Sequence, residues 1–217
     1  PRTDPALKKN YTSSSLAKKL NNKLFLQKKC GFTPNKNIPV VGMVSRLSWQ
    51  KGVDFVTEDI IKDSECQFIF LGTGGSKYEK HLQKLARQSP DKVNAHIDFD
   101  IKFARQIYAG SDIFLMPSRF EPCGLGQMIA MRYGTVPVVR ATGGLKDTVT
   151  ARTGFKFNQA DPEALHQTLT KALKTYHTKP EQWREMQKRG MNRDFSWEKS
   201  AGKYRRLYGE IMGSRKS

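Results

Sequence analysis

The segments IFLM at residues 113–116, PSRFEPCGLGQ at 117–127 and MIAMRY at 128–133 are typical of a strand, a loop and a helix in succession. Glycines in such a loop allow backbone N–H groups to face an anion where the following helix begins. The loop also carries one carboxylate, Glu121, and a basic neighbour, Arg119. This stretch therefore predicts a site for a phosphate-bearing ligand with one acid beside it.

The rest of the chain continues this alternation of short apolar runs and helix-like segments. We predict strands at residues 38–44, 67–71, 93–97, 112–116, 136–139 and 153–157. We predict helices at residues 16–29, 53–62, 76–88, 100–109, 128–133, within 141–149, and at 161–176, 180–190 and 197–212. Short strands that alternate with helices are typical of βαβ units. The sequence therefore predicts an α/β fold in which a Rossmann-like parallel β-sheet is flanked by helices.

The composition limits the classes of partner. A chain of 217 residues can bury one sizeable core. Lys and Arg outnumber Asp and Glu by 38 to 20, and the net charge of +18 favours nucleotides, nucleic acid or an acidic surface as partners. A solubilising surface, or one half of a larger protein whose other half is more acidic, explains the charge equally well.

The cysteines and the apolar runs give further bounds. Cys30, Cys66 and Cys123 have neither CxxC spacing nor a histidine partner, so we expect no disulfide framework or zinc site and a reducing compartment. No apolar run reaches the roughly 18 residues of a membrane span, and no signal peptide opens the chain. The polar start, PRTDPALKKNY, predicts a connector rather than the beginning of a domain.

Charged and glycine-rich segments follow the predicted strands. Arg46 and Lys51 come after the first strand, where both could reach a diphosphate; solvated surface charges are the alternative. GTGG at 72–75 lacks the full G-x-G-x-x-G spacing, so it either lets the backbone approach a ribose or phosphate or makes a tight turn. Since ligands of parallel sheets bind at the carboxyl ends of the strands, we expect these loops and the loop at 117–127 to converge.

Aromatic residues and histidines give weaker signals. Phe99, which follows the third strand, could stack on a base or belong to the core. The histidines show no metal spacing, so we interpret them as structural or solvated; they are His81, His96, His166 and His177. The aromatic residues of the last helix favour packing over stacking on nucleic acid; they are Phe195, Trp197, Tyr204 and Tyr208.

Several stretches together resemble one family. They are VSRLSWQKG, FLGTGG, TGFKF and the long segment ARQIYAGSDIFLMPSRFEPCGLGQMIAMRYGTVPVVRATGGLKDTV. From about Thr3 onward the chain resembles the C-terminal half of bacterial glycogen synthases and plant starch synthases, which are retaining glucosyltransferases of the two-domain GT-B architecture. The resemblance implies a connector and cationic helix at 1–30, a nucleotide-sugar-binding domain at 31–190 and, at 191–217, a helix that packs back towards an N-terminal domain absent from this chain.

The resemblance also implies roles for individual residues. Arg46 and Lys51 would hold the diphosphate and stabilise the departing ADP, and Glu121 would lie beside the transferred glucose; these three are the expected catalytic residues. The expected nucleotide-sugar-binding residues are Gly72, Thr73, Gly74, Phe99, Cys123, Gly124, Leu125, Gly126, Thr142, Gly143 and Gly144. The resemblance implies no metal and no other cofactor.

The chain departs from the family pattern at two places and agrees with the synthase subgroup at a third. The family usually has threonine where this chain has Gly126, which removes a hydroxyl donor near the distal phosphate. The segment between Val149 and Gly154 is shorter than expected, so a mobile loop would be absent. Many GT-B enzymes carry a second glutamate eight residues after the first; Ile129 stands there, which agrees with the synthase subgroup.

The function implied by the resemblance is the ADP-glucose-binding part of a glycogen or starch synthase. Such an enzyme extends the non-reducing end of an α-1,4-glucan with retention, and this part alone would be inactive. The implied partners are ADP-glucose or ADP and, through the other domain, the glucan, with no nucleic acid and no membrane. The location would be cytoplasmic in a bacterium and plastidic in a plant or alga. The alternatives are a GT-B transferase that uses UDP-glucose or another acceptor and, more remotely, a polyanion-binding module.

Overall fold

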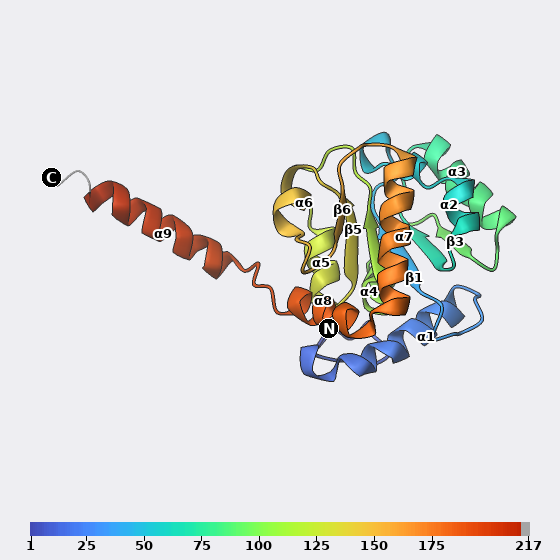
Figure 1. The fold of residues 1–217 in the computed structure, drawn as a ribbon, viewed down its shortest axis with the longest axis horizontal. Coiled ribbons are helices and arrows are strands. Elements are labelled where there is room, and N and C mark those ends of the chain that lie inside the picture. The colour runs from blue at the N-terminus through green and yellow to red at the C-terminus, as the bar shows by residue number, and fades with distance from the viewer. Residues whose placement is uncertain (214–217) are drawn as a thin grey trace.

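The six predicted strands form one parallel sheet with helices on both faces (Figure 1). The computed structural model describes residues 1–213. The strands are β1 Val40–Val44, β2 Gln67–Leu71, β3 Val93–His96, β4 Ile113–Met116, β5 Val136–Arg140 and β6 Phe155–Phe157. Their order in the sheet is β3-β2-β1-β4-β5-β6. The order reverses direction between β1 and β4, and such a switch point is where open α/β sheets bind their ligands.

Helices connect successive strands. The α-helices are α1 Lys19–Lys29, α2 Glu58–Asp63, α3 Ser76–Gln88, α4 Ile101–Gly110, α5 Gly126–Arg132, α6 Gly143–Thr148, α7 Pro162–Thr178, α8 Pro180–Met191 and α9 Trp197–Gly213. The 3₁₀ helices are η1 Ser13–Lys18, η2 Trp49–Lys51 and η3 Val53–Phe55. Asp100 and Asp161 are the N-cap residues of α4 and α7, because each carboxylate accepts a hydrogen bond from the backbone N–H three residues further along.

Successive residues of the central strands point alternately into two hydrophobic cores, one on each face of the sheet. In β2, Phe68 and Phe70 face the core shared with α2, α3 and α7, whereas Ile69 and Leu71 face the core shared with α1 and α4. A strand buried on both faces needs an uninterrupted apolar run, and QFIFL supplies four such residues in a row. The period of two therefore fixes which helix layer each residue meets.

The predicted helix at 53–62 is wrong in its first half. The chain instead forms η2 and η3 and begins α2 only at Glu58, after Thr57, whose side-chain oxygen accepts a hydrogen bond from the Ile60 N–H. Gly52 separates the two 3₁₀ turns with φ of 65°, and a Cβ there would lie 2.2 Å from the Pro117 carbonyl oxygen. The predicted helix is interrupted further along, at Val56 (φ −80°, ψ 92°) and Thr57 (φ −90°, ψ 168°), whose extended backbone a regular helix cannot include. The glycine at position 52 allows the loop after β1 to pack directly on the loop after β4.

The cationic helix α1 buries two of its lysines against the amino edge of the sheet. Lys23 Nζ lies 2.8 Å from Asp112 Oδ2, and both side chains are almost fully buried. Lys19 Nζ donates to the carbonyl oxygen of Ala109 at 2.7 Å and to Thr135 Oγ1 at 2.8 Å. These side chains therefore fasten the helix to the sheet rather than face solvent. The Lys23 charge is paired with a carboxylate, as a buried charge requires, whereas Lys19 is hydrogen-bonded to neutral oxygens.

The buried ammonium of Lys19 predicts a pH-dependent stability. Desolvation lowers the pKa of Lys19 from 10.5 to about 7. Above pH 7 the unfolded chain keeps a proton that the folded chain has lost, so the free energy of unfolding should rise with pH, by about 2 kcal/mol between pH 7 and 8.5. We expect urea titrations to show this slope in the wild-type chain and not in Lys19→Met. Equal slopes in both chains would contradict the prediction.

The pH range of this experiment ends at 8.5 because, at higher pH, other groups lower the free energy of unfolding. Burial raises the pKa of the Cys30 thiol to about 12 and that of the Tyr108 phenol to about 12. Such groups lose protons first in the unfolded chain, so their contribution to stability falls as the pH rises beyond their ordinary values. The difference between wild type and Lys19→Met removes these shared contributions.

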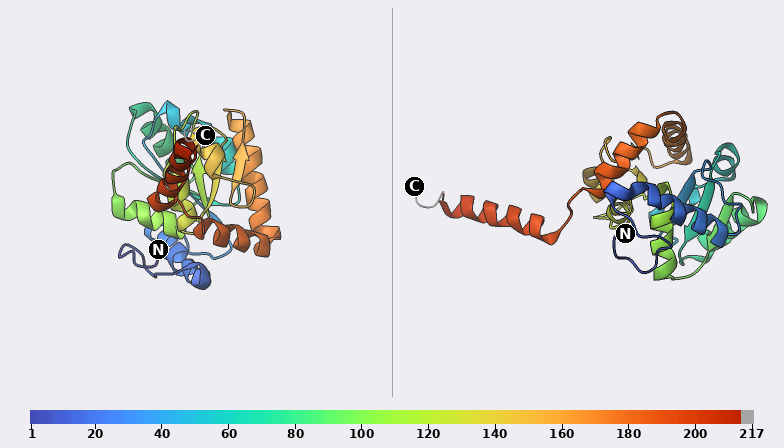
Figure 2. Two further views of the ribbon diagram at one scale, coloured as in Figure 1. Left: turned by 90° about the vertical axis from the view of Figure 1, so that its left-hand side faces the viewer. Right: turned by 90° about the horizontal axis from the view of Figure 1, so that it is seen from below.

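The last helix, α9, extends away from the rest of the molecule (Figures 1 and 2). Its large apolar side chains Trp197, Tyr204, Leu207 and Tyr208 are exposed. The predicted packing of this helix on an N-terminal domain stays a prediction, and residues 214–217 of the predicted segment lie outside the described residues. No helix in the described part of the chain is long and apolar enough to cross a membrane.

Candidate functional site

The loops that follow β1 and β4 meet at the carboxyl edge of the sheet, as the sequence predicts. The two strands are neighbours, so residues 45–52 and 117–125 leave the sheet side by side. The Arg119 N–H donates to the Gln50 carbonyl oxygen at 2.8 Å, and Gln50 Nε2 donates to the Phe120 carbonyl oxygen at 3.3 Å. These bonds hold the two loops in a fixed relative position.

Lys51 and Glu121 form an ion pair across this junction. Lys51 Nζ lies 2.5 Å from Glu121 Oε2, and Ser118 Oγ donates to the same oxygen at 3.3 Å. Glu121 is only 8% exposed, so its charge needs such a partner. The partner of Glu121 comes from the loop after another strand, 70 residues away, rather than from helical spacing.

Two adjoining cavities open at this edge. The first, here the acid cavity, has a volume of about 360 Å³ and is lined by Arg46, Lys51, Glu121 and the loop residues 124–126, among others. The second, the aromatic cavity, has a volume of about 730 Å³ and includes Arg46, Gly72, Thr73, Phe99 and Tyr108 in its lining. Arg46 belongs to both cavities. A ligand with an anionic middle and two unlike ends could therefore span them with its charge beside Arg46.

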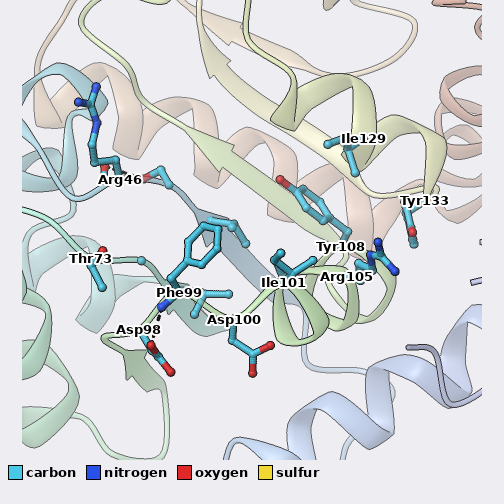
Figure 3. A pocket seen from close by; sticks show the side chains of 15 residues that line it. Arg46, Thr73, Asp98, Phe99, Asp100, Ile101, Arg105, Tyr108, Ile129 and Tyr133 are labelled. Carbon is cyan, nitrogen blue, oxygen red and sulfur yellow. Dashed lines mark hydrogen bonds between the residues drawn. The ribbon is translucent and has the colours of Figure 1, made fainter. Parts of the chain in front are cut away.

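Phe99 projects into the aromatic cavity between Arg46 at one end and Tyr133 at the other (Figure 3). Its side chain is 80% exposed, so the alternative of a core phenylalanine is wrong. Asp98 Oδ1 accepts a hydrogen bond from the Phe99 N–H at 2.7 Å, which fixes the backbone of this short loop. An exposed ring on a held backbone can stack on a flat ligand.

Sequence reasoning missed part of the aromatic cavity. Ile101, Arg105 and Tyr108 line it from α4 (Figure 3). Arg105 Nη1 is 3.6 Å from Asp4 Oδ1, so the N-terminal segment also contacts this helix. The only available signal was the spacing of Ile101, Arg105 and Tyr108, which places them on one side of the helix.

The GTGG turn packs closely on the loop after β1 and also reaches the aromatic cavity, whereas its approach to a ribose or phosphate stays a prediction. Gly72 and Thr73 line the aromatic cavity, whereas Gly74 does not. A Cβ on Gly72 would lie 1.8 Å from the Ser45 carbonyl oxygen, and one on Gly74 would lie 2.0 Å from that of Leu47. The glycines therefore allow the loop after β2 to pack directly on the backbone of the loop after β1, and this contact brings Thr73 to the cavity.

Thr142, Gly143 and Gly144 do not line either cavity. They lie behind the acid-bearing loop, where the Gly144 N–H donates to the carbonyl oxygens of Glu121 and Pro122, both at 3.2 Å. A Cβ on Gly143 would lie 2.0 Å from the Glu121 carbonyl oxygen. These residues thus pack against the backbone of that loop, and their predicted contact with the nucleotide sugar stays a prediction.

The other loop residues divide in the same way. Gly124, Leu125 and Gly126 line the acid cavity, whereas Cys123 is exposed and lines neither cavity. A Cβ on Gly126 would lie 3.1 Å from Phe114 Cε1 and 3.2 Å from Met116 Sδ, so a larger residue there would have to displace these side chains. Among the described residues, no group of three His, Cys, Asp or Glu side chains could hold a metal ion.

Comparison with known proteins places this geometry in a family. Residues 15–190 match the family described as glycosyl transferases group 1. The chain therefore belongs to the group 1 glycosyl transferases, and its sheet flanked by helices matches the GT-B fold.

Within this family, the chain is similar to glycogen and starch synthases. It is 49% identical over 224 residues to a glycogen synthase of Geotalea daltonii and 46% identical over 223 residues to one of Kosmotoga olearia, and each match covers 99% of this chain and 46% of the relative. Starch synthase IV of Arabidopsis thaliana, solved as a catalytic domain bound to ADP and acarbose, superposes with a TM-score of 0.88 at 36% identity, over 97% of this chain and 46% of that one.

The predicted resemblance is confirmed, including its restriction to about half of the relatives' length. A sucrose-phosphate synthase from Thermosynechococcus elongatus shares the fold alone, with a TM-score of 0.67 at 21% identity.

Proposed function

We propose that this chain is the ADP-glucose-binding domain of a glycogen or starch synthase that transfers glucose to the non-reducing end of an α-1,4-glucan with retention. The observation that carries the proposal is the convergence of Arg46, Lys51 and Glu121 at the switch point of the sheet, where two cavities adjoin. The similarity to glycogen synthases and to a starch synthase solved with ADP supports the choice of donor.

The two cavities divide the donor between them. The aromatic cavity would take the adenosine, with the base against Phe99, and the acid cavity would take the glucose beside Glu121. Arg46, which lines both, would then face the diphosphate, with Lys51 reaching it from the floor of the acid cavity. A guanidinium supplies paired N–H donors and an ammonium a compact charge, so together they complement a diphosphate.

The chemical step would depend on electrostatics. Glucosyl transfer breaks the bond between the anomeric carbon and the phosphate oxygen, so the sugar gains positive character while negative charge grows on the departing ADP. Cations held in place before the reaction stabilise that charge without the cost of reorganising solvent. Lys51 and Arg46 would act on the phosphate and Glu121 on the sugar. We propose that no metal or other cofactor takes part, because these side chains already supply the charge that a cation would bring.

The acceptor would bind to a second domain. The chain spans 46% of the length of its glycogen synthase relatives, and α9 carries exposed aromatic residues away from the sheet. We propose that α9 packs on that domain and that the isolated chain is inactive, since the cleft needs both halves. The enzyme would act in the cytoplasm of a bacterium or in a plastid.

Calorimetric titration of the chain with ADP, ADP-glucose and UDP-glucose tests the donor assignment. We expect the adenine ligands to bind and UDP-glucose to bind at least about tenfold more weakly, since one lost base contact of about 1.4 kcal/mol has that effect. Phe99→Ala should weaken the binding of ADP and leave the binding of inorganic pyrophosphate unchanged.

Other results would change the proposal in defined ways. Preference for UDP-glucose would favour a related transferase with another donor. Binding of any polyanion with a steep salt dependence and no preference among the nucleotides would favour a polyanion-binding module.

A further inference from the structure

Arg119 extends from the loop after β4 and grips the loop after β1. Its Nη1 and Nη2 donate to the two carboxylate oxygens of Asp54, each at 2.7 Å, and Nη1 also donates to the Trp49 carbonyl oxygen at 2.8 Å. One guanidinium therefore contacts Trp49, which precedes Lys51 in the loop, and Asp54, which follows it. A planar fork is needed for this double contact, which an ammonium cannot reproduce.

Two aromatic rings hold the guanidinium from its faces. Its central carbon lies 4.1 Å from the centre of the Phe55 ring and 4.8 Å from that of the Trp49 ring. Stacking on aromatic faces suits a planar cation and restricts its movement. The Arg119 side chain is 16% exposed and that of Asp54 is 36% exposed, and the hydrogen bonds from Arg119 lower the pKa of the Asp54 carboxyl.

The backbone of Arg119 is fixed as well. Its N–H donates to the Gln50 carbonyl oxygen at 2.8 Å, and its carbonyl oxygen accepts a hydrogen bond from Arg140 Nη1. Arg140 is the last residue of β5, so two loops and the end of this strand are joined at Arg119. Glu121 is two residues further along the same loop, and Lys51 lies two residues beyond Trp49.

We propose that Arg119 is a positioning residue: its bidentate, stacked guanidinium sets the distance between Lys51 and Glu121 by clamping the loop that carries one to the loop that carries the other. Without the clamp, the hydrogen bonds from the Arg119 N–H to Gln50 and from Gln50 Nε2 to Phe120 still join the two loops. Trp49 and Asp54, which flank Lys51, then lose their contact with the loop of Glu121, so the two ends of the ion pair are held less closely. The effect on donor binding rests on the proposed function, whereas the effect on the ion pair does not.

Competitive acylation of lysines, read by peptide mass spectrometry, tests the clamp without any ligand. In Arg119→Lys, which keeps the charge but loses the fork, Lys51 should react about tenfold faster, as expected for a released charged hydrogen bond. Lys29, whose Nζ donates to Gln106 Oε1 at 2.8 Å in another part of the fold, serves as internal reference. Arg184→Lys is the matched control, because within residues 1–213 the ion-pair partner of that guanidinium is Glu181 on the same helix, at 3.7 Å.

The outcomes separate positioning from stabilisation. A folded Arg119→Lys chain with a lower melting temperature and unchanged Lys51 reactivity would overturn the proposal, because a merely stabilising residue gives that result. If this variant does not fold, Asp54→Asn removes the clamped charge at constant volume and should raise Lys51 reactivity in the same direction.

Titration with ADP then tests the consequence: we expect about tenfold weaker binding in Arg119→Lys than in Arg184→Lys. If the wild-type chain does not bind ADP, the proposed function fails while the acylation result still decides the clamp.

Discussion

Replacing Lys51 with alanine is expected to lower glucosyl transfer by about 10²–10³-fold in a complete two-domain enzyme that contains this chain. Removal of one donor aimed at the developing negative charge costs roughly 3–4 kcal/mol of barrier in comparable sites. Lys51 Nζ is held 2.5 Å from Glu121 Oε2, so the ammonium is in place before the donor arrives. Initial rates with ADP-glucose and a soluble glucan measure the effect.

The same substitution removes the partner of a buried carboxylate. Glu121 is 8% exposed and, in the described part of the chain, would retain Ser118 alone as a side-chain partner, so a displaced loop would account for part of the loss. Glu121→Gln and the double variant close a cycle that separates the two effects. If the double variant is no slower than Glu121→Gln alone, the effect of Lys51→Ala depends on the glutamate, and Lys51 acts through Glu121. Near wild-type turnover in Lys51→Ala itself would show that the proposed role is wrong.

Much of the fold follows from local patterns in the sequence. QFIFL at 67–71 and IFLM at 113–116 are short and almost wholly apolar. Each is followed by a loop and a segment of helical pattern, and this arrangement predicts buried parallel strands. The structure confirms both of them as strands, β2 and β4. The rule that loops at the carboxyl ends meet then places Arg46 and Lys51 beside the loop of Glu121 without any knowledge of side-chain contacts.

The parts that sequence reasoning missed are tertiary contacts. Lys51 and Glu121 are 70 residues apart, so no spacing rule pairs them. The break in the predicted helix at 53–62 comes from the extended backbone of Val56 and Thr57, and Val56 is packed in the core shared with α2, α3 and α7, a tertiary constraint that propensities do not contain. Thr142 to Gly144 support the loop from behind, although glycines in that position after a strand equally suggest contact with a ligand. Local patterns identify the loops, and long-range packing decides what each residue does.

Replacing Gly144 with alanine is expected to disable the site from a position that lines neither cavity. A Cβ there would lie 2.1 Å from the Cys123 carbonyl oxygen, while the Gly144 N–H is bonded to the carbonyl oxygens of Glu121 and Pro122. Backbone atoms cannot rotate away as a side chain can, so the loop must move outward. Such overpacking should lower the free energy of unfolding by about 3 kcal/mol, which urea titration measures.

Gly202→Ala is the matched control, because a Cβ at Gly202 in α9 meets no atom within 4 Å. Alanine is preferred to glycine within a helix, so this variant should be unchanged or slightly more stable. The displaced loop in Gly144→Ala should also expose the Lys51–Glu121 pair, so acylation of Lys51 should rise there and not in Gly202→Ala. If Gly144→Ala retained both wild-type stability and wild-type Lys51 reactivity, the glycine would not be a support of the loop. Lower stability together with faster acylation of Lys51 would show that the segment at 142–144 acts on the site through the backbone of Glu121.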